Sequence, residues 1–138
     1  MAQLRLGLPD LEKHEAELLQ VTHNTVEEAR RYGKFYRFDF PYLCDPARAV
    51  HERYGLALES AAPTEIVRSM AASASDLLLR GERTPLPIPF AMRYPGKDAP
   101  QAVFVIDRQG IVRAVHRMDP NAGLPTVAAL LKDLASID

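Results

Sequence analysis

The chain has 138 residues, 47% of them apolar and 25% charged, a composition that predicts one globular domain over residues 1–138. Its 17 basic and 18 acidic residues are mixed along the sequence and give a net charge of -1, which argues against nucleic acid or a membrane as a partner. The single cysteine, Cys44, excludes an internal disulfide and a thiol-only zinc site, and without an export signal we expect a cytoplasmic protein.

The first predicted elements are a helix and a short strand. Leucines at helical spacing favour a helix within residues 3–16. Pro9 lies inside this range, and a proline removes a backbone donor, so the segment forms either two short turns or a helix that begins near Pro9. Residues 18–21 (Leu-Leu-Gln-Val) are largely apolar and precede turn-forming residues, which predicts a short buried strand.

A capping box marks the next helix. The hydroxyl of Thr25 can accept a helix amide while the carboxylate of Glu28 reaches back to the amide of Thr25, which predicts a helix from Val26 to about Tyr36. Arg30-Arg31, the longest basic cluster, shares this helix with acidic neighbours and is expected to form a solvated face rather than a phosphate site.

A second helix is predicted after an extended segment. Residues 38–43 are largely apolar and extended in pattern, and Asp45-Pro46 places a proline where a helix can begin. Gly55 then ends that helix.

Residues 56–100 have the pattern of an insert with a helical part and a proline-rich part. Pro63-Thr64-Glu65 is a helix start, and the apolar spacing that follows predicts an amphipathic helix closing near Gly81. Five prolines between residues 84 and 100 remove so many amide donors that we expect a surface loop without regular structure there.

The strongest local pattern is a β-hairpin. Residues 102–106 are apolar on both faces, which predicts a central strand, and residues 111–116 form the second strand. Gly110 can adopt the left-handed conformation that closes the intervening loop with a bulge. A final helix is predicted over residues 125–135, and the complete order of elements indicates an α/β sandwich.

Three segments carry a resemblance to a known family. They are residues 17–32 (ELLQVTHNTVEEARRY), residues 40–55 (FPYLCDPARAVHERYG) and residues 103–113 (VFVIDRQGIVR). Their order resembles that of the peroxiredoxin or AhpC/TSA (redoxin) family, from about Gln3 to Leu134. The resemblance implies a thioredoxin-like α/β sandwich with a mixed sheet. The segment between Tyr54 and Pro100 is similar to an insert found in a peroxiredoxin-like branch.

The same resemblance implies that sequence is missing before Met1. In the family, a central strand and the reactive cysteine precede the helix that is expected here near Gln3. We therefore expect a domain truncated at its N-terminus and lacking the active-site strand, from a shortened reading frame or a start placed after a codon such as that for selenocysteine. If the chain is complete, its strands must pair directly or be completed by a partner.

Cys44 is the one candidate catalytic residue, because it is the only thiol. By its position in the resemblance it lies in a turn where the family has no catalytic group, so it does not correspond to the peroxidatic cysteine. It precedes the predicted helix start at Pro46, whereas the adjacent Asp45 opposes thiolate formation. We favour a structural role for this cysteine over a reactive one.

The remaining polar candidates show no motif. The four histidines, His14, His23, His51 and His116, lack paired metal-ligand spacing, and we expect no metal and no cofactor. His23 is the most interesting because it follows a strand of the parallel type, where α/β sites form. Asp107 and Asp119 are expected to be turn residues. Gln101 stands about where the resemblance implies a cis-proline or an arginine, and Pro100 would take that place only if the register slips.

Two functions follow as expectations. The resemblance implies a thiol-dependent antioxidant oxidoreductase that reduces peroxide, with thioredoxin or glutathione as reductant, although this chain should be inactive without its peroxidatic cysteine. The alternative is a non-catalytic thioredoxin-fold module that binds a partner or forms a homo-oligomer through exposed strand edges.

Overall fold

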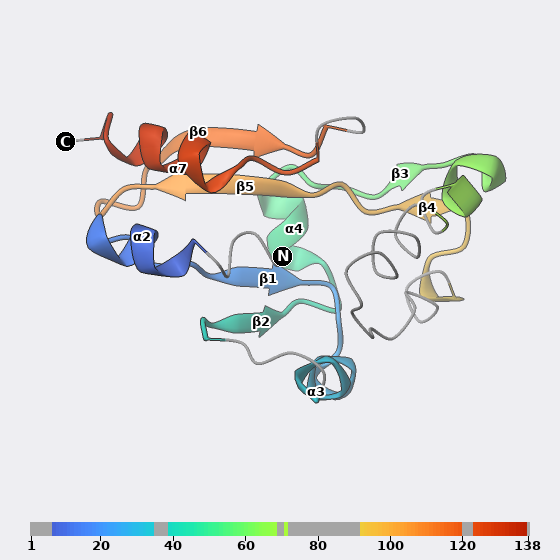
Figure 1. Ribbon diagram of the computed structural model, residues 1–138. Helices are drawn as coiled ribbons and strands as arrows, with labels where there is room; N and C mark the ends of the chain where they lie inside the picture. The colour runs from blue at the N-terminus through green and yellow to red at the C-terminus, as the bar shows by residue number, and fades with distance from the viewer. Residues whose placement is uncertain (1–6, 35–38, 69–70, 72–91, 120–122, 138) are drawn as a thin grey trace. The chain divides into compact units, whose positions relative to one another are not determined.

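Figure 1 shows the computed structural model of the chain, which describes residues 7–34, 39–68, 71, 92–119 and 123–137. The described residues form short helices and three two-stranded sheets, in agreement with an α/β class. Contacts divide the chain into two compact units, one of residues 1–20, 39–41 and 100–138 and the other of residues 21–38 and 42–99.

The predicted β-hairpin is confirmed and forms the centre of the first unit. Strands β5 (Ala102–Ile106) and β6 (Val112–Arg117) pair antiparallel, with a register shift between Val105 and Ile106. Gly110 has φ 82°, and its amide bonds the carbonyl of Asp107 at 3.0 Å, so the loop closes as the glycine predicts. In the described part of the chain β5 pairs with β6 alone, so its predicted central position is not confirmed.

The core of this unit lies between the hairpin and the last helix, α7 (Val127–Leu134). Val105 and Leu130 are its buried centre. The partly buried residues packed around them are Leu18, Val103, Ala114, Leu134 and Ile137. The helix begins two residues later than predicted because Thr126 is its N-cap, with the hydroxyl accepting from the amide of Ala129 at 3.3 Å.

Helix α2 (Leu8–Lys13) confirms the alternative in which the first helix begins near Pro9. Pro9 lies in its first turn, where a missing amide costs no helical hydrogen bond. Gly7 caps the helix, and a Cβ placed there would overlap the side chain of Val127. The glycine therefore allows the close approach of α2 to α7. The earlier part of the predicted helix, residues 3–6, lies outside the described residues.

Strands β1 (Gln20–Thr22) and β2 (Tyr42–Cys44) form a sheet and point the same way (Figure 1). The amide of Asp45 donates to the carbonyl of Thr22 at 2.6 Å and continues this parallel pairing. The first strand was predicted at residues 18–21 and begins two residues later. Backbone pairing begins at Gln20, whose amide donates to the carbonyl of Pro41 at 2.9 Å, and Leu18 packs in the apolar cluster of the first unit.

Helix α3 (Val26–Gly33) begins with the predicted capping box. The Glu28 amide bonds the Thr25 hydroxyl at 3.2 Å, and the Thr25 amide bonds the Glu28 carboxylate at 2.8 Å. The helix ends at Gly33, short of the predicted Tyr36, which lies outside the described residues. On its outer face Arg31 pairs with Glu27 at 2.8 Å, which confirms a solvated face there.

Helix α4 (Ala49–Arg53) does not begin at Pro46, so that prediction is wrong. Arg48 adopts a left-handed backbone with φ 59°, which no continuous α-helix contains, and the helix starts after it. The predicted end is confirmed, since Gly55 follows the helix with φ 71°.

The insert contains more regular structure than expected. Residues 63–68 are helical as predicted, while most of the continuation toward Gly81 lies outside the described residues. Strand β4 (Lys97–Asp98) pairs antiparallel with β3 (Glu59–Ser60), which corrects the prediction of an irregular loop throughout residues 84–100. Pairing is possible because Lys97 and Asp98 lie between prolines and keep their own amides. No helix within the described ranges is long and apolar enough to cross a membrane.

Candidate functional site

A buried carboxylate organises the turn between β2 and α4. Asp45 has 8% of its surface exposed. Its Oδ2 accepts hydrogen bonds from the amides of Val50 at 2.9 Å and His51 at 3.1 Å, and from the ring Nδ1 of His51 at 2.7 Å. Burial raises the pKa of Asp45, but the hydrogen bonds from His51 and Val50 outweigh it and hold the pKa below its ordinary value.

The contact with Asp45 determines the tautomer of His51. An ionised carboxylate only accepts hydrogen bonds, so the Nδ1 of His51 carries the proton and donates it. The Nε2 of a neutral His51 is then an acceptor. A histidine oriented by a buried carboxylate is the arrangement that general bases and metal ligands use.

The second histidine of the unit, His23, lies beside the first. The two ring centroids are 6.4 Å apart and the rings are tilted by 51°. Burial, followed by the electrostatic effects of Arg48, His51 and Arg93, lowers the pKa of His23 to about 4 against a smaller opposing effect of Glu28. His23 is therefore neutral at physiological pH.

Arg93 connects this pair to the start of α3. Its Nη1 donates to the carbonyl of His23 at 3.0 Å, and its Nη2 to the carboxylate of Glu28 at 2.7 Å. Burial raises the pKa of Glu28, while the Thr25 amide and Arg93 lower it, and the net direction is below the ordinary value. Glu28 thus serves both the capping box and an ion pair, so it does not belong to the solvated face that the sequence predicts for α3.

Arg48 completes the cluster. The residue is 2% exposed, and its Nη2 donates to the carbonyl of Leu56 at 2.5 Å. We refer to Asp45, His51, His23, Arg93 and Arg48 as the histidine–arginine cluster. All of its members lie in the second unit.

The family assignment comes from comparison with known proteins. A model of the AhpC/TSA family matches residues 1–115. The chain belongs to the AhpC/TSA family. Searches of curated proteins and of solved structures found no match. The family carries a thioredoxin-like fold and supports a peroxiredoxin-like redox function at the level of the family, so the predicted family and thioredoxin-like α/β fold class are confirmed, while the predicted N-terminal truncation stays a prediction.

In this AhpC/TSA chain the one thiol lies on a strand. Cys44 is the last residue of β2 and is half-buried, whereas the sequence predicts a turn position. The predicted helix start beside it is also absent, since α4 begins at Ala49. Cys44 is followed directly by the carboxylate of Asp45. Of the two features expected to affect the reactivity of Cys44, the helix start near Pro46 is absent and Asp45 remains. The negative charge of Asp45 opposes formation of a thiolate.

The other predicted polar residues lie apart from the cluster. His14 bonds the carbonyl of Asp10 at 2.9 Å, and His116 bonds Asp133 at 2.5 Å. Asp107 is a turn residue as predicted, accepting the amides of Gln109 and Ile111, each at 2.9 Å.

The positions for which the resemblance implies a cis-proline or an arginine show neither. Gln101 precedes β5, and its carbonyl accepts the amide of Met118 at 2.8 Å. The described peptide bonds are trans, so Pro100 does not serve as a cis-proline. Asp119 forms an isolated antiparallel bridge with Gly123, in keeping with its predicted turn role.

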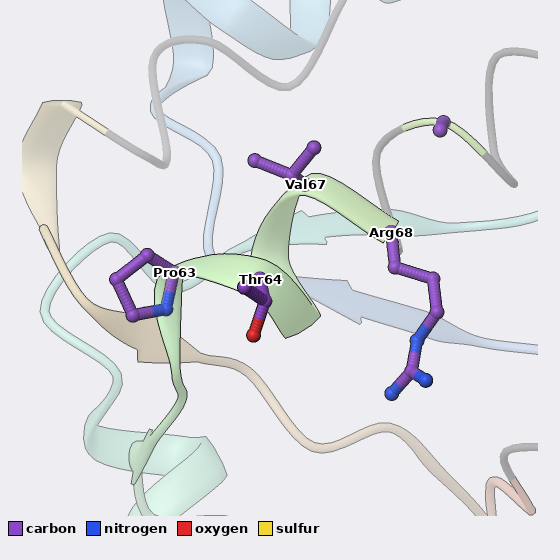
Figure 2. Close-up of a pocket in the computed structure, with 5 residues that line it drawn as sticks. Pro63, Thr64, Val67 and Arg68 are labelled. Carbon is purple, nitrogen blue, oxygen red and sulfur yellow. The ribbon is translucent and has the colours of Figure 1, made fainter.

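A separate pocket lies on the helical segment of the insert. Figure 2 shows Pro63, Thr64, Val67 and Arg68, which line it together with Ala71, and its volume is about 390 Å³. These residues come from one short stretch of chain and none is a histidine, cysteine or carboxylate. Among these lining residues the Thr64 hydroxyl has no general base beside it that would activate it.

Sequence reasoning selected His23 but missed its partners. Arg48 and Arg93 were not singled out, and His51 was considered only as one of four widely spaced histidines. One signal was available for Arg48: the turn-forming Asp45-Pro46 immediately before it. No local pattern links Arg93 with His23, because 70 positions separate the two residues.

Proposed function

We propose that this protein is a thiol-dependent peroxidase of the peroxiredoxin type and that Cys44 is not its peroxidatic residue. Membership of the AhpC/TSA family carries the first part of the proposal. The second part is supported by the position of Cys44 at the end of β2, beside Asp45 and four residues short of its nearest following helix. If the family chemistry operates in this protein, its nucleophile is then a thiol outside residues 1–138.

The proposed reaction has two steps. A cysteine thiolate attacks one oxygen of the peroxide, the O–O bond breaks, and the cysteine becomes a sulfenic acid while water or an alcohol leaves with a proton. A dithiol or two thiols from the thioredoxin or glutathione system then reduce the sulfenic acid, releasing water and forming a disulfide. Residues 1–138 would support this chemistry as scaffold.

A coupled peroxidase assay tests the proposal. The purified 138-residue chain is supplied with hydrogen peroxide and either reductant system, and NADPH consumption is followed. We expect background rates that do not change in Cys44→Ser, with circular dichroism confirming that both proteins are folded. A rate above background that disappears in Cys44→Ser would overturn the assignment of Cys44.

The coding sequence provides a second test. Translation of the DNA upstream of the Met1 codon, over about 80 residues, is sufficient to complete a domain of ordinary size. A cysteine codon after a predicted strand, or an in-frame stop that can be read as selenocysteine, would support the peroxidase. Absence of coding sequence there would count against it.

The second candidate is a non-catalytic module that forms a homo-oligomer through its strands. Exposed apolar side chains on and beside the hairpin favour it: Ile106, Ile111, Val112 and Val115 are each more than 40% exposed. Apolar residues on a two-stranded sheet are suited to pairing with a second copy. Size-exclusion chromatography with light scattering would support this function by showing a discrete oligomer that Val115→Lys dissociates, and a monomer would exclude it.

A further inference from the structure

Arg48 is the most unusual residue of the histidine–arginine cluster because two nitrogens of its buried guanidinium have no hydrogen-bond acceptor among the residues that the structure describes. Only 2% of the residue is exposed. Its Nη2 bonds the Leu56 carbonyl, while Nε and Nη1 have no hydrogen-bond acceptor within the described parts of the chain. Buried guanidinium groups are normally paired with a carboxylate or another anion, since an unpaired buried charge is strongly unfavourable.

The neighbouring carboxylates are engaged elsewhere. The Oδ2 of Asp45 accepts from Val50 and His51, and Glu28 pairs with Arg93. Neither carboxylate forms a hydrogen bond with Arg48. Arg48 and Arg93 both lower the pKa of His23, while Glu28 raises it, so the region holds charges of both signs and the open hydrogen-bonding capacity is that of Arg48.

The backbone of Arg48 adds a second, independent observation. Its φ of 59° lies in the left-handed region, which favours glycine and disfavours a long side chain. Residues held in this conformation are concentrated at ligand-binding and catalytic sites, where the side chain has a use that offsets the strain. Glycine would adopt this backbone conformation without strain. The presence of arginine at this position therefore points to a role for the guanidinium group.

We propose that Arg48 anchors a binding site for a small oxyanion of the phosphate or carboxylate kind, with His23 at its edge. The oxygen atoms of such an anion accept charge-assisted hydrogen bonds from Nε–H and Nη1–H, which the protein leaves unpaired. Because these nitrogens are shielded from solvent, an anion that reaches them binds inside the unit. The site does not depend on a peroxidatic cysteine, so the anion-binding proposal is tested independently of the proposed peroxidase function.

An NMR titration of the wild-type chain tests the proposal directly. Inorganic phosphate replaces sodium chloride at constant ionic strength and constant neutral pH, and the Cε1–H signals of the four histidines are followed. We expect a saturable shift at His23, whereas His14 in the other unit serves as the internal reference. A parallel titration with acetate distinguishes a phosphate site from a general carboxylate site. If His23 shows no saturable shift with either anion, the proposal is wrong.

Matched variants assign the effect to Arg48. Arg48→Met keeps the apolar stem and removes the charge, and we expect its apparent affinity for the anion to fall at least about tenfold. Arg31→Met removes an exposed arginine of the same unit that already pairs with Glu27, and it should titrate like the wild type. An undiminished shift in Arg48→Met would refute the site. If that variant does not fold, the wild-type titration still decides whether an anion binds.

Discussion

The two compact units bury different kinds of side chain. In the first unit the buried residues Leu11, Val105 and Leu130 are apolar. In the second unit Leu56 is accompanied by three buried polar residues: Thr22, Asp45 and Arg48. An apolar core gains stability from the area it removes from water, whereas a polar interior is stable only when each group has a partner in the correct geometry.

This difference indicates that the first unit is a structural scaffold and that the second unit holds the candidate site. In the first unit a hairpin packs against a helix, and the buried residues that the structure describes there include no cluster of titratable groups. The second unit retains charged groups in its interior, a left-handed arginine and a histidine with a strongly lowered pKa. Left-handed backbone does not by itself distinguish the units, since Glu15 of the first unit has φ 53°. Strongly perturbed ionisable groups are concentrated at functional sites, and the large shift of His23 makes the second unit the better place to look for binding or chemistry.

The largest expected effect is in the apolar core. Leu130→Ala should lower the free energy of unfolding by about 2–5 kcal/mol, because Leu130 is 4% exposed and its removal leaves a cavity beside Val105. Urea denaturation measures the change. Leu19→Ala is the matched control in the same unit, since Leu19 is 53% exposed, and it should change stability by no more than about 0.5 kcal/mol. Equal losses in the two variants would show that this core is not the stabilising element we describe.

A smaller loss is expected in the polar interior. Asp45→Ala removes the acceptor for two amides and the His51 ring, and should reduce the free energy of unfolding by about 1–3 kcal/mol. Asp45→Asn keeps one side-chain oxygen and should lose less. Urea denaturation of both variants tests this order. If Asp45→Ala leaves the free energy of unfolding unchanged, the hydrogen bonds of Asp45 do not stabilise the fold. The second unit would then not depend on its polar interior in the way we describe.

Local sequence patterns predicted the first unit well. The hairpin follows from two apolar runs around Gly110, and the last helix from its apolar spacing, because both depend on residues close together in the chain. The capping box of Thr25 and Glu28 was predicted for the same reason. These patterns also carried the family resemblance, which the AhpC/TSA match confirms.

The polar cluster could not be predicted in this way. The pairing of Arg93 with Glu28 joins positions 65 residues apart, and charge alone does not identify the partner of an arginine. Arg48 was missed because its left-handed backbone contradicts the helix that Asp45-Pro46 predicts. Tertiary contacts overrode local propensity at the site, while the scaffold followed it.

The smallest expected effect is a dependence of stability on pH that originates in the polar interior. The pKa of His23 is about 4 in the folded protein and 6.5 ordinarily. Between these values the unfolded chain binds more protons than the folded one, so stability falls as pH decreases from about 6.5 toward 4. Because the ring is partly exposed, we expect the loss from His23 to be on the order of 1–2 kcal/mol. At still lower pH, protonation of Asp45 and Glu28 adds to the loss, since their pKa values are lowered too.

Urea denaturation at a series of pH values, from neutral down to about 5, measures this slope where the carboxylates contribute least. His23→Gln should flatten it, because the variant has no imidazole that becomes charged on unfolding. His14→Gln changes an exposed histidine of the other unit and should leave the slope intact. A wild-type stability that does not change with pH in this range would mean that His23 is as accessible to protons in the folded chain as in the unfolded one. The second unit would then lack the buried environment of His23 on which its distinction from the first unit depends.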